Sequence, residues 1–333
     1  MNPDMSVDEL LNPRIHIVCG KGGVGKTTVS AALALVAARH GRKVCVVEVD
    51  RKGSLPKLFG AKSPSYEPSE LSPGVWGLNV LQEDALAEYL NVQYHMQRIS
   101  RVLTSSHFVD YITIAAPGLK DILVLGKIWY LEQDRSADGK HYDFDTIIVD
   151  APAAGHMIAF LSAPMGLSDA VQVGPIRRQS DWLVEMLQDT ARTVAHVVAM
   201  AEEMPVAETI ATSEALHDRL HIAQGAAFVN GLYPKIVGAS AERAVEDDSE
   251  ARDGLIRAGA LVNLTLDDGD LDALADYARF LSSRRKIQAR HLRALRKGID
   301  QPILNLPFLF SSGIALPEIE MLADDIEQQA LEL

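Results

Sequence analysis

A glycine-rich loop near the start of the chain has the residue types and spacing of a phosphate-binding site. It follows the apolar run 15–19 and precedes the Ala/Leu/Val-rich run 29–39, so the sequence predicts a strand, a loop and a helix in that order. The loop residues expected to bind a nucleotide are Gly20, Lys21, Gly22, Gly23, Val24, Gly25, Lys26, Thr27 and Thr28. Backbone N–H groups and the positive end of the helix dipole would stabilise a polyphosphate there. Every fixed position of the pattern GxxxxGKT is present, which favours nucleotide binding over an ordinary glycine turn.

Three side chains predict how the phosphates and Mg²⁺ would be held. Lys26 should reach the β- and γ-phosphate oxygens, and the Thr27 hydroxyl should ligate Mg²⁺. Asp150 follows the buried run 146–149, and a carboxylate there should hold the same ion through a water molecule. Open parallel sheets place their ligands at the carboxyl ends of the strands, so we expect Asp150 beside the loop.

The chain is long and apolar enough for one large α/β core, with 333 residues of which 47% are apolar. Alternating strand-like and helical patterns predict a P-loop NTPase fold, with a mostly parallel sheet flanked by helices. Beyond the first strand, the predicted strands are 43–49, 146–149, 194–199, 225–229 and 303–306.

The connections between these strands differ in composition. Residues 61–77 are rich in Pro, Ser and Gly and predict a surface connection. Helical patterns at 83–103 and 119–131 predict a small helical elaboration. We expect a single domain over 1–333, elaborated at about 83–131 and 179–220.

Charge and cysteine usage exclude several classes of protein. A net charge of −13 argues against broad electrostatic binding to nucleic acid or anionic lipid. No apolar run has membrane length and the N-terminus lacks a signal pattern, so we expect a cytoplasmic protein, peripheral at the inner membrane only through a partner. Cys19 and Cys45 lie in strand-like runs and should be small core residues.

The loop contains a second lysine, Lys21, and with it the motif resembles that of a known group of proteins. The form GKGGVGKTT resembles the deviant Walker A motif of ATPases that include MinD, ParA, the nitrogenase iron protein and the arsenical-pump ATPases. In that group this lysine crosses a dimer interface and touches the partner's phosphates. The resemblance therefore implies an ATP-dependent dimer, in which Lys21 acts in catalysis in trans, alongside Lys26. A solvated lysine is the alternative.

Residues 150–156 narrow the resemblance to the arsenical-pump and tail-anchored-protein-targeting ATPases. Their sequence, DAPAAGH, is similar to the family's switch II, DTAPTGH, at Asp150, Gly155 and His156. The Gly155 N–H could meet the γ-phosphate and so distinguish ATP from ADP. His156 alone would more often be a surface or capping histidine than a catalytic one. Ala154 replaces the family's threonine, and Pro152 falls one position early.

Residues 50–55, DRKGSL, are similar to the family's switch I, DPAHSL, at Asp50, Ser54 and Leu55. The resemblance implies that Asp50 positions or activates the attacking water, and a carboxylate near the γ-phosphate can orient one. A helix N-cap is the alternative for Asp50. Because Arg51 and Gly53 replace the proline and the histidine, we expect slow hydrolysis.

Further segments extend the resemblance along the chain. Residues 117–121 are similar to the PGxxE/D segment that precedes switch II, and residues 200–209 are similar to the AEFLSLYET-like run of the family. Asn230 matches the asparagine that reads the adenine edge, although a strand-end asparagine is also an ordinary turn residue. Pro307 and Phe308 would supply an apolar wall for the base, or simply form a buried loop.

The predicted helix 271–297 carries Arg284, Arg285, Lys286, Arg290, Arg293, Arg296 and Lys297. A solvated face is the leading interpretation of these charges. The helix also resembles the family helix that follows a zinc-binding CxxC pair, but the aligned positions are Ala278 and Leu281, so no zinc is expected. The cysteine trio of the arsenite-binding pump ATPases is absent as well.

The sequence is compatible with more than one client, that is, the molecule on which this ATPase acts. Methionine and tryptophan side chains in 85–131 and 182–204 suit an apolar client, although ordinary core packing explains them as well. The predicted function is hydrolysis of ATP to ADP and phosphate by a homodimer, or by a heterodimer with a related ATPase, serving a membrane anion transporter or an apolar client. A positioning or partitioning ATPase resembling MinD or ParA is the alternative, and a ligase such as dethiobiotin synthase is a weaker one.

Overall fold

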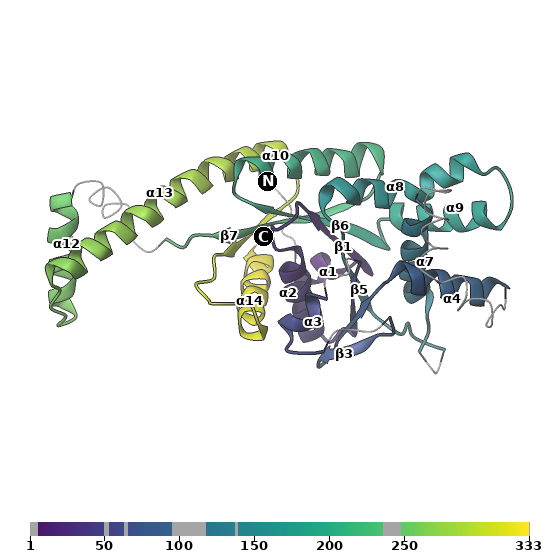
Figure 1. Ribbon diagram of the computed structural model, residues 1–333, viewed down its shortest axis with the longest axis horizontal. Coiled ribbons are helices and arrows are strands. Elements are labelled where there is room, and N and C mark those ends of the chain that lie inside the picture. Colours follow the sequence, from purple (N-terminus) through teal and green to yellow (C-terminus); the bar gives the residue numbers. More distant parts are fainter. Residues whose placement is uncertain are drawn as a thin grey trace.

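The protein is described by a computed structural model that covers residues 6–49, 53–62, 66–94, 118–136, 139–235 and 248–332 (Figure 1). The strands are β1 Ile15–Gly20, β2 Val44–Glu48, β3 Ser69–Ser72, β4 Val75–Asn79, β5 Thr146–Asp150, β6 Thr193–Met200, β7 Gln224–Leu232 and β8 Ile303–Pro307. The helices before β6 are α1 Val7–Leu11, α2 Lys26–Arg39, α3 Leu55–Leu58, α4 Gln82–Tyr94, α7 Leu119–Gln133, α8 Ala154–Ala170 and α9 Pro175–Gln188. The later helices are α10 Glu203–Glu214, the π-helical turn η1 Ala215–Arg219, α12 Asp248–Leu261, α13 Asp268–Gly298 and α14 Leu316–Glu332.

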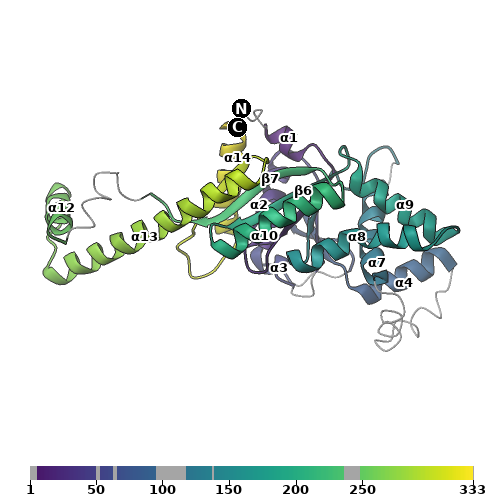
Figure 2. The same cartoon turned by 90° about the horizontal axis from the view of Figure 1, so that it is seen from above.

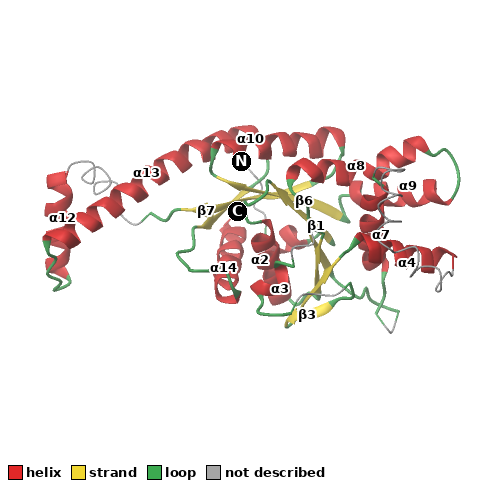
Figure 3. Ribbon diagram, viewed as in Figure 1, coloured by secondary structure: helices red, strands yellow, loops and turns green. Residues whose placement is uncertain are grey.

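Within the described residues, the strands form one eight-stranded sheet in the order β3-β4-β2-β5-β1-β6-β7-β8 (Figure 3). Adjacent strands are parallel except for the edge pair β3 and β4. Every position of β1, β2 and β5 is buried, as the uninterrupted β-branched runs in a parallel sheet require. The predicted α/β fold with a mostly parallel sheet is confirmed, and each predicted strand is present.

The prediction of a surface connection at residues 61–77 is wrong. This segment contains β3 and the start of β4, which form an antiparallel pair around the turn at Gly74. Gly74 has φ +79°, a conformation that glycine adopts without strain. The Pro-Gly pair therefore marks a hairpin turn, and β4 extends the sheet by pairing parallel to β2.

The sheet separates two layers of helices (Figures 1 and 3). On one face, α2 and α14 pack together with α1 and α3 over a core that includes Leu33, Val46 and Ile326. On the other face, α7, α8, α9 and α10 cover a core that includes Ile147 and Leu161. None of the helices in the described residues is long and apolar enough to cross a membrane.

The predicted helical elaboration and the predicted helix 271–297 both correspond to helices of the structure. Helices α4 and α7 overlap the predicted elaboration 83–131 and extend one residue before and two residues beyond it, and residues 95–117 between them lie outside the described part of the chain. The predicted helix 271–297 is α13, which is 31 residues long. With α12 it extends away from the sheet as an arm that is visible in two perpendicular views (Figures 1 and 2).

The two cysteines are buried, free residues of the core strands β1 and β2, which β5 separates. Burial raises the pKa of the Cys19 thiol to about 12, and burial also raises the pKa of Cys45. Both therefore stay protonated and unreactive at neutral pH, and their interpretation as small core residues is confirmed.

Two histidines lie side by side in the buried part of the sheet, on β1 and β6. His16 Nδ1 and His196 Nε2 are 3.0 Å apart, and the rings stack with their centroids 5.3 Å apart. The Ala226 N–H donates to His196 Nδ1, so His196 Nε2 carries the proton and donates to His16. Burial lowers the pKa of His16 to about 3 and that of His196 to about 4, so both are neutral at pH 7.

This pair predicts a loss of stability in mild acid. Below pH 6.5, the ordinary pKa of histidine, both histidines are protonated in the unfolded chain but stay neutral in the folded protein. Stability is therefore retained above pH 6.5 and lost as the pH falls toward 4, by about 2 kcal/mol per histidine at pH 5. His16→Gln should reduce the pH dependence of the unfolding free energy, measured with urea between pH 5 and 7.5, while the exposed His217→Gln should not. An unchanged slope in His16→Gln would contradict this assignment.

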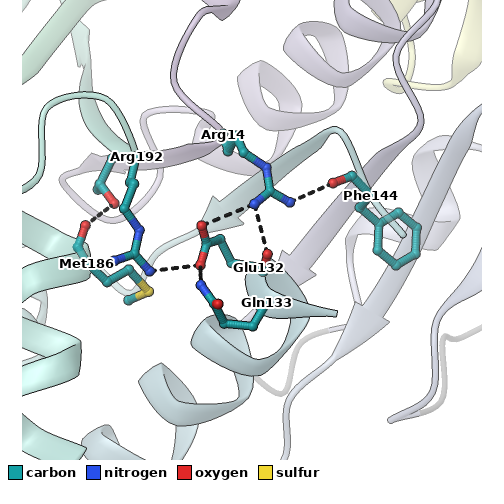
Figure 4. A network of polar contacts seen from close by, with 7 residues as sticks. Arg14, Glu132, Gln133, Phe144, Met186 and Arg192 are labelled. Carbon is teal, nitrogen blue, oxygen red and sulfur yellow. Dashed lines mark hydrogen bonds and ion pairs between the residues drawn. The ribbon is translucent and has the colours of Figure 1, made fainter. Parts of the chain in front are cut away.

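The buried carboxylate of Glu132, near the end of α7, forms ion pairs with two arginines that directly precede β1 and β6 (Figure 4). Glu132 is 3% exposed and pairs with Arg14 at 3.1 Å and with Arg192 at 2.8 Å. Arg14 also donates to the backbone oxygens of Glu132 at 2.8 Å and Phe144 at 2.9 Å. Burial lowers the pKa of Arg14, and Glu132 opposes that effect. The network joins elements that are far apart in the sequence. It lies at the amino ends of the strands, whereas the glycine-rich loop lies at their carboxyl ends.

Candidate nucleotide site

The glycine-rich loop joins β1 to α2, as predicted. Strand β1 lies in the interior of the sheet, between β5 and β6, and the loop begins at its carboxyl end. Gly25 is the N-cap of α2 and has φ +95°, and a methyl group at this position would lie 2.2 Å from Asn230 Nδ2. At Gly20 a methyl group would lie 2.3 Å from the Val198 carbonyl oxygen. A Cβ at Gly20 would collide with backbone, and one at Gly25 would need a left-handed backbone and a shift of the Asn230 side chain, so both positions favour glycine.

Thr27 and Asp150 meet at the start of α2. The Thr27 hydroxyl donates to Asp150 Oδ2 over 2.6 Å, and the Asp150 residue is 6% exposed at the carboxyl end of β5. A hydroxyl and a carboxylate are the hard oxygen donors that Mg²⁺ prefers. Among the described residues no group of three or more His, Cys, Asp or Glu side chains could hold a metal ion.

The two lysines of the loop have different surroundings. Lys26 is the first residue of α2, and its ammonium group donates to the Lys21 carbonyl oxygen over 3.3 Å. The Lys26 charge thus lies over the loop, where phosphates would bind. The Lys21 ammonium group instead pairs at 2.7 Å with Glu208, on α10, and the two side chains are 32% and 38% exposed.

Asp50 lies outside the described residues, so its predicted role stays a prediction. Ser54, the other switch I residue, has its backbone N–H bonded to Glu48 Oε1 over 2.7 Å. Glu48 is 1% exposed, ends β2, and also accepts from Asn79 Nδ2 over 3.3 Å. Glu48 is opposite Asp150 in the sheet register and holds the chain just beyond Asp50.

The role of Glu48 was not predicted from the sequence, although the sequence contains a signal for it. It is a charged residue inside an otherwise apolar, β-branched run, Val44 to Val49. A carboxylate is rarely buried in such a run without a partner, so this departure from the pattern could have indicated a positioning residue.

The predicted switch II residues lie at the start of α8. A methyl group built at Gly22 would be 3.9 Å from the Ala153 side chain, so this segment borders the loop. Gly155 and His156 belong to the first turn of α8. Burial raises the pKa of Asp121, and His156 opposes that shift, so the segment similar to PGxxE/D and switch II are neighbours.

Asn230 and the predicted base wall lie at the carboxyl ends of β7 and β8. The Asn230 amide donates to the Val24 carbonyl oxygen over 2.9 Å, so one of its donors is used on the loop. The Phe308 N–H donates to the Leu232 carbonyl oxygen over 2.8 Å, directly after Pro307. The Phe308 ring stacks on Tyr233 with centroids 4.8 Å apart and is 38% exposed. The roles of Asn230, Pro307 and Phe308 toward adenine stay predictions.

A glycine-rich loop between a central parallel strand and a buried helix, with a carboxylate at the end of the adjacent strand, defines a P-loop nucleotide-binding protein. The sequence profile of the family described as "Anion-transporting ATPase" matches residues 13–328. The chain belongs to this family.

Three named relatives illustrate how far the similarity extends. ATPase BagA of Mycobacterium tuberculosis is 34% identical over 334 residues, which cover 96% of this chain and 94% of the relative. The ATPase get3 of Schizosaccharomyces japonicus is 27% identical over 154 residues, 46% of this chain and 45% of the relative. The arsenical pump-driving ATPase of Acidiphilium multivorum is 27% identical over 233 residues, 65% of this chain and 39% of the relative. The family relationship supports ATP hydrolysis by this chain.

Proposed function

We propose that the protein is a Mg²⁺-dependent ATPase that works as an ATP-gated dimer and handles an apolar client. Lys26 and the loop N–H groups bind the β- and γ-phosphates, and Thr27 and Asp150 hold Mg²⁺, Asp150 through a water molecule. When bound, Mg²⁺ neutralises charge on the phosphate oxygens. Asp50 orients the attacking water, and Glu48 fixes the chain that follows it through Ser54.

The proposal of an apolar client rests on an apolar cavity in the layer of helices that contains α7, α8 and α9. It has a volume of about 350 Å³ and lies between α4, α7, α8 and α9. Its wall includes Leu86, Leu183 and the stacked pair Trp129 and Trp182, whose ring centroids are 5.4 Å apart. A membrane-length helix is about 30 Å long and 10–12 Å wide, so the cavity would accept a few of its side chains rather than the whole helix.

Filling the cavity should weaken client binding and spare hydrolysis. Gly126 on α7 lines the cavity, and a methyl group added there meets no atom within 4 Å, so Gly126→Leu can place its side chain in the cavity from an unobstructed Cβ. A Trp-free, lysine-flanked Leu/Ala peptide of about 20 residues, the length of a membrane span, is titrated while tryptophan emission is recorded. We expect an affinity at least about tenfold weaker than wild type, whereas Gly166→Leu, at an exposed position on α8, should bind normally. Equal affinity in Gly126→Leu and wild type would remove the support for a client at this cavity.

The position of Lys21 supports a role in trans. The Lys21 and Glu208 side chains of this pair are 32% and 38% exposed, and pairs near the surface contribute at most about 1 kcal/mol, so little energy opposes release of the lysine. In a closed dimer the Lys21 charge would reach the partner's phosphates, as arginine fingers do.

Lys21→Ala should abolish the ATP-dependent increase in mass and lower hydrolysis by about 10³-fold, the lower end of the range for a charge supplied in trans. Solution mass is measured without nucleotide, with Mg-ADP and with Mg-ATP, alongside phosphate release. Glu208→Gln removes the same ion pair but leaves the lysine, so it should keep both activities. If the two variants behave alike, Lys21 only anchors α10 and the trans role is wrong.

A heterodimer with a related ATPase is a second arrangement for the same chemistry. The replacements Ala154, Arg51 and Gly53 in the two switches could be compensated by a partner subunit. A chain that binds ATP in the mass experiment but neither dimerises nor hydrolyses would favour this arrangement. We also propose that residues 1–333 act as one domain.

A further inference from the structure

The apolar cavity between α4, α7, α8 and α9 has a charged cluster in its wall. Lys127, on α7, and Glu88, on α4, both line the cavity, and their side chains pair over 2.8 Å. The Lys127 side chain is 5% exposed and the Glu88 side chain is 30% exposed. The Lys127 ammonium group also lies 4.4 Å from the centre of the Tyr66 ring. A buried ammonium group is therefore present at a mostly apolar site.

The hydrogen bonds of this cluster leave ammonium donors available. Glu88 accepts from Lys127 through Oε1 and from the Tyr66 hydroxyl through Oε2, so both carboxylate oxygens have a donor. An ammonium group has three N–H donors. Within the described part of the chain, Glu88 is the acceptor that lies within hydrogen-bond distance of Lys127. At least one buried N–H of Lys127 therefore needs an acceptor that a ligand or a water molecule would supply.

The ordinary interpretation of the pair is a link that holds α4 against α7. Apolar residues of similar size often stabilise such a contact as well as a buried ion pair does, or better. Helix packing therefore does not by itself require a lysine at this position. The place of Lys127 in the cavity wall indicates a second role, which is to orient whatever enters the cavity.

We propose that the cavity binds a small neutral amphiphile, an apolar chain that ends in a hydroxyl or carbonyl oxygen, and that Lys127 donates a hydrogen bond to this oxygen. The inference rests on the proposed function, because it names the chemical class of the apolar client. Sites for small molecules have volumes of about 300–1,000 Å³ and mostly apolar walls with a few polar groups. The volume of about 350 Å³ and the buried ammonium group in the wall fit such a ligand.

The charges of the cluster select against ionised ligands. Lys127 and Glu88 carry opposite charges, so the pair is neutral as a whole. A ligand carboxylate would compete with Glu88 for Lys127, and a ligand ammonium group would compete with Lys127 for Glu88. Either ion would leave an unbalanced charge in the cavity wall, which costs far more than burying a hydroxyl group that is hydrogen-bonded. A neutral oxygen uses a remaining Lys127 donor and leaves the ion pair intact.

A comparison of three ligands with the same alkyl chain tests this selectivity. The full-length chain is titrated at pH 7 with n-octanol, octanoate or octylamine while tryptophan emission is recorded, because Trp129 and Trp182 line the cavity. We expect n-octanol to bind at least about tenfold more tightly than either ionised ligand, as a hydrogen bond to a charged group allows. Equal affinities for the three ligands would overturn the proposed selectivity.

Replacement of the ammonium group tests the role of Lys127. Lys127→Met has a side chain of similar length without a donor, and Lys127→Met/Glu88→Met also removes the carboxylate that would be left unpaired. Both variants should bind n-octanol at least about tenfold more weakly than wild type. Lys43→Met/Asp143→Asn is the matched control, because it removes a lysine–carboxylate pair of 2.9 Å that lies outside the cavity wall. Wild-type affinity for n-octanol in the double variant at the cavity would overturn the role of Lys127.

The Gly126→Leu variant and the Leu/Ala peptide separate this inference from the proposed function. Binding of n-octanol that Gly126→Leu weakens would support both. Binding of the peptide without binding of n-octanol would overturn the small amphiphile and leave an apolar peptide client in place. Binding of neither probe to the wild-type chain would overturn the client cavity together with the inference.

Discussion

Lys26→Ala is expected to lower the rate of ATP hydrolysis about 10²–10³-fold. The Lys26 ammonium group is the charge that the structure places over the glycine-rich loop. Removal of one preorganised charge of this kind costs about 10²–10³ in turnover, or about 3–4 kcal/mol of transition-state stabilisation. Phosphate release under saturating Mg-ATP measures the turnover, and equilibrium binding of a fluorescent ATP analogue measures the affinity, which should also weaken.

The matched control is Lys57→Ala. Lys57 is an exposed lysine on α3, and its loss changes the net charge equally without touching the loop. It should hydrolyse ATP at the wild-type rate. Turnover above about a tenth of wild type in Lys26→Ala, far more than loss of a preorganised charge leaves, would show that the lysine is not a main source of stabilisation.

Glu132→Ala is expected to cause the largest loss of stability. The substitution leaves Arg14 and Arg192 partly buried without their shared carboxylate (Figure 4). Removing one partner of a buried ion pair costs about 3–5 kcal/mol. Urea unfolding at pH 7 measures the loss, and ATP hydrolysis at low temperature should persist because the network lies at the edge opposite the nucleotide site.

An exposed ion pair provides the comparison for Glu132. Asp324 pairs with Arg39 at 2.7 Å but is 69% exposed, so Asp324→Ala should change the urea midpoint little. Glu132→Gln should lie between the two variants, because an amide keeps one acceptor for the arginines. If Glu132→Ala unfolds at the same urea concentration as Asp324→Ala, the network does not hold α7 to the sheet.

The sequence predicted the central part of the fold because its patterns are local. Runs such as 146–149 are apolar without interruption, which only a buried parallel strand or a core helix allows, and the following Asp150 marks the strand end. The hairpin at 69–79 was missed because Pro, Ser and Gly indicate both turns and loops, and an edge strand has few apolar residues.

The candidate site was predictable where its members are consecutive. The loop residues form one motif, and the structure adds the 2.6 Å contact between Thr27 and Asp150. The pairing of Lys21 with Glu208 and the bond from Ser54 to Glu48 were not predictable, since sequence distance does not show which side chains meet. The role of Asp50 stays a prediction of the motif alone.

The complete burial of α2 has a mechanical consequence. All residues from Val29 to Ala37 are buried in the core that α2 shares with the sheet and α14, and a close-packed layer of this kind resists displacement. We therefore expect a displacement at the start of α8 to pass through the opposite layer, toward α7 and the apolar cavity of that layer. The sheet would then separate a layer that anchors the nucleotide from a layer that responds to it.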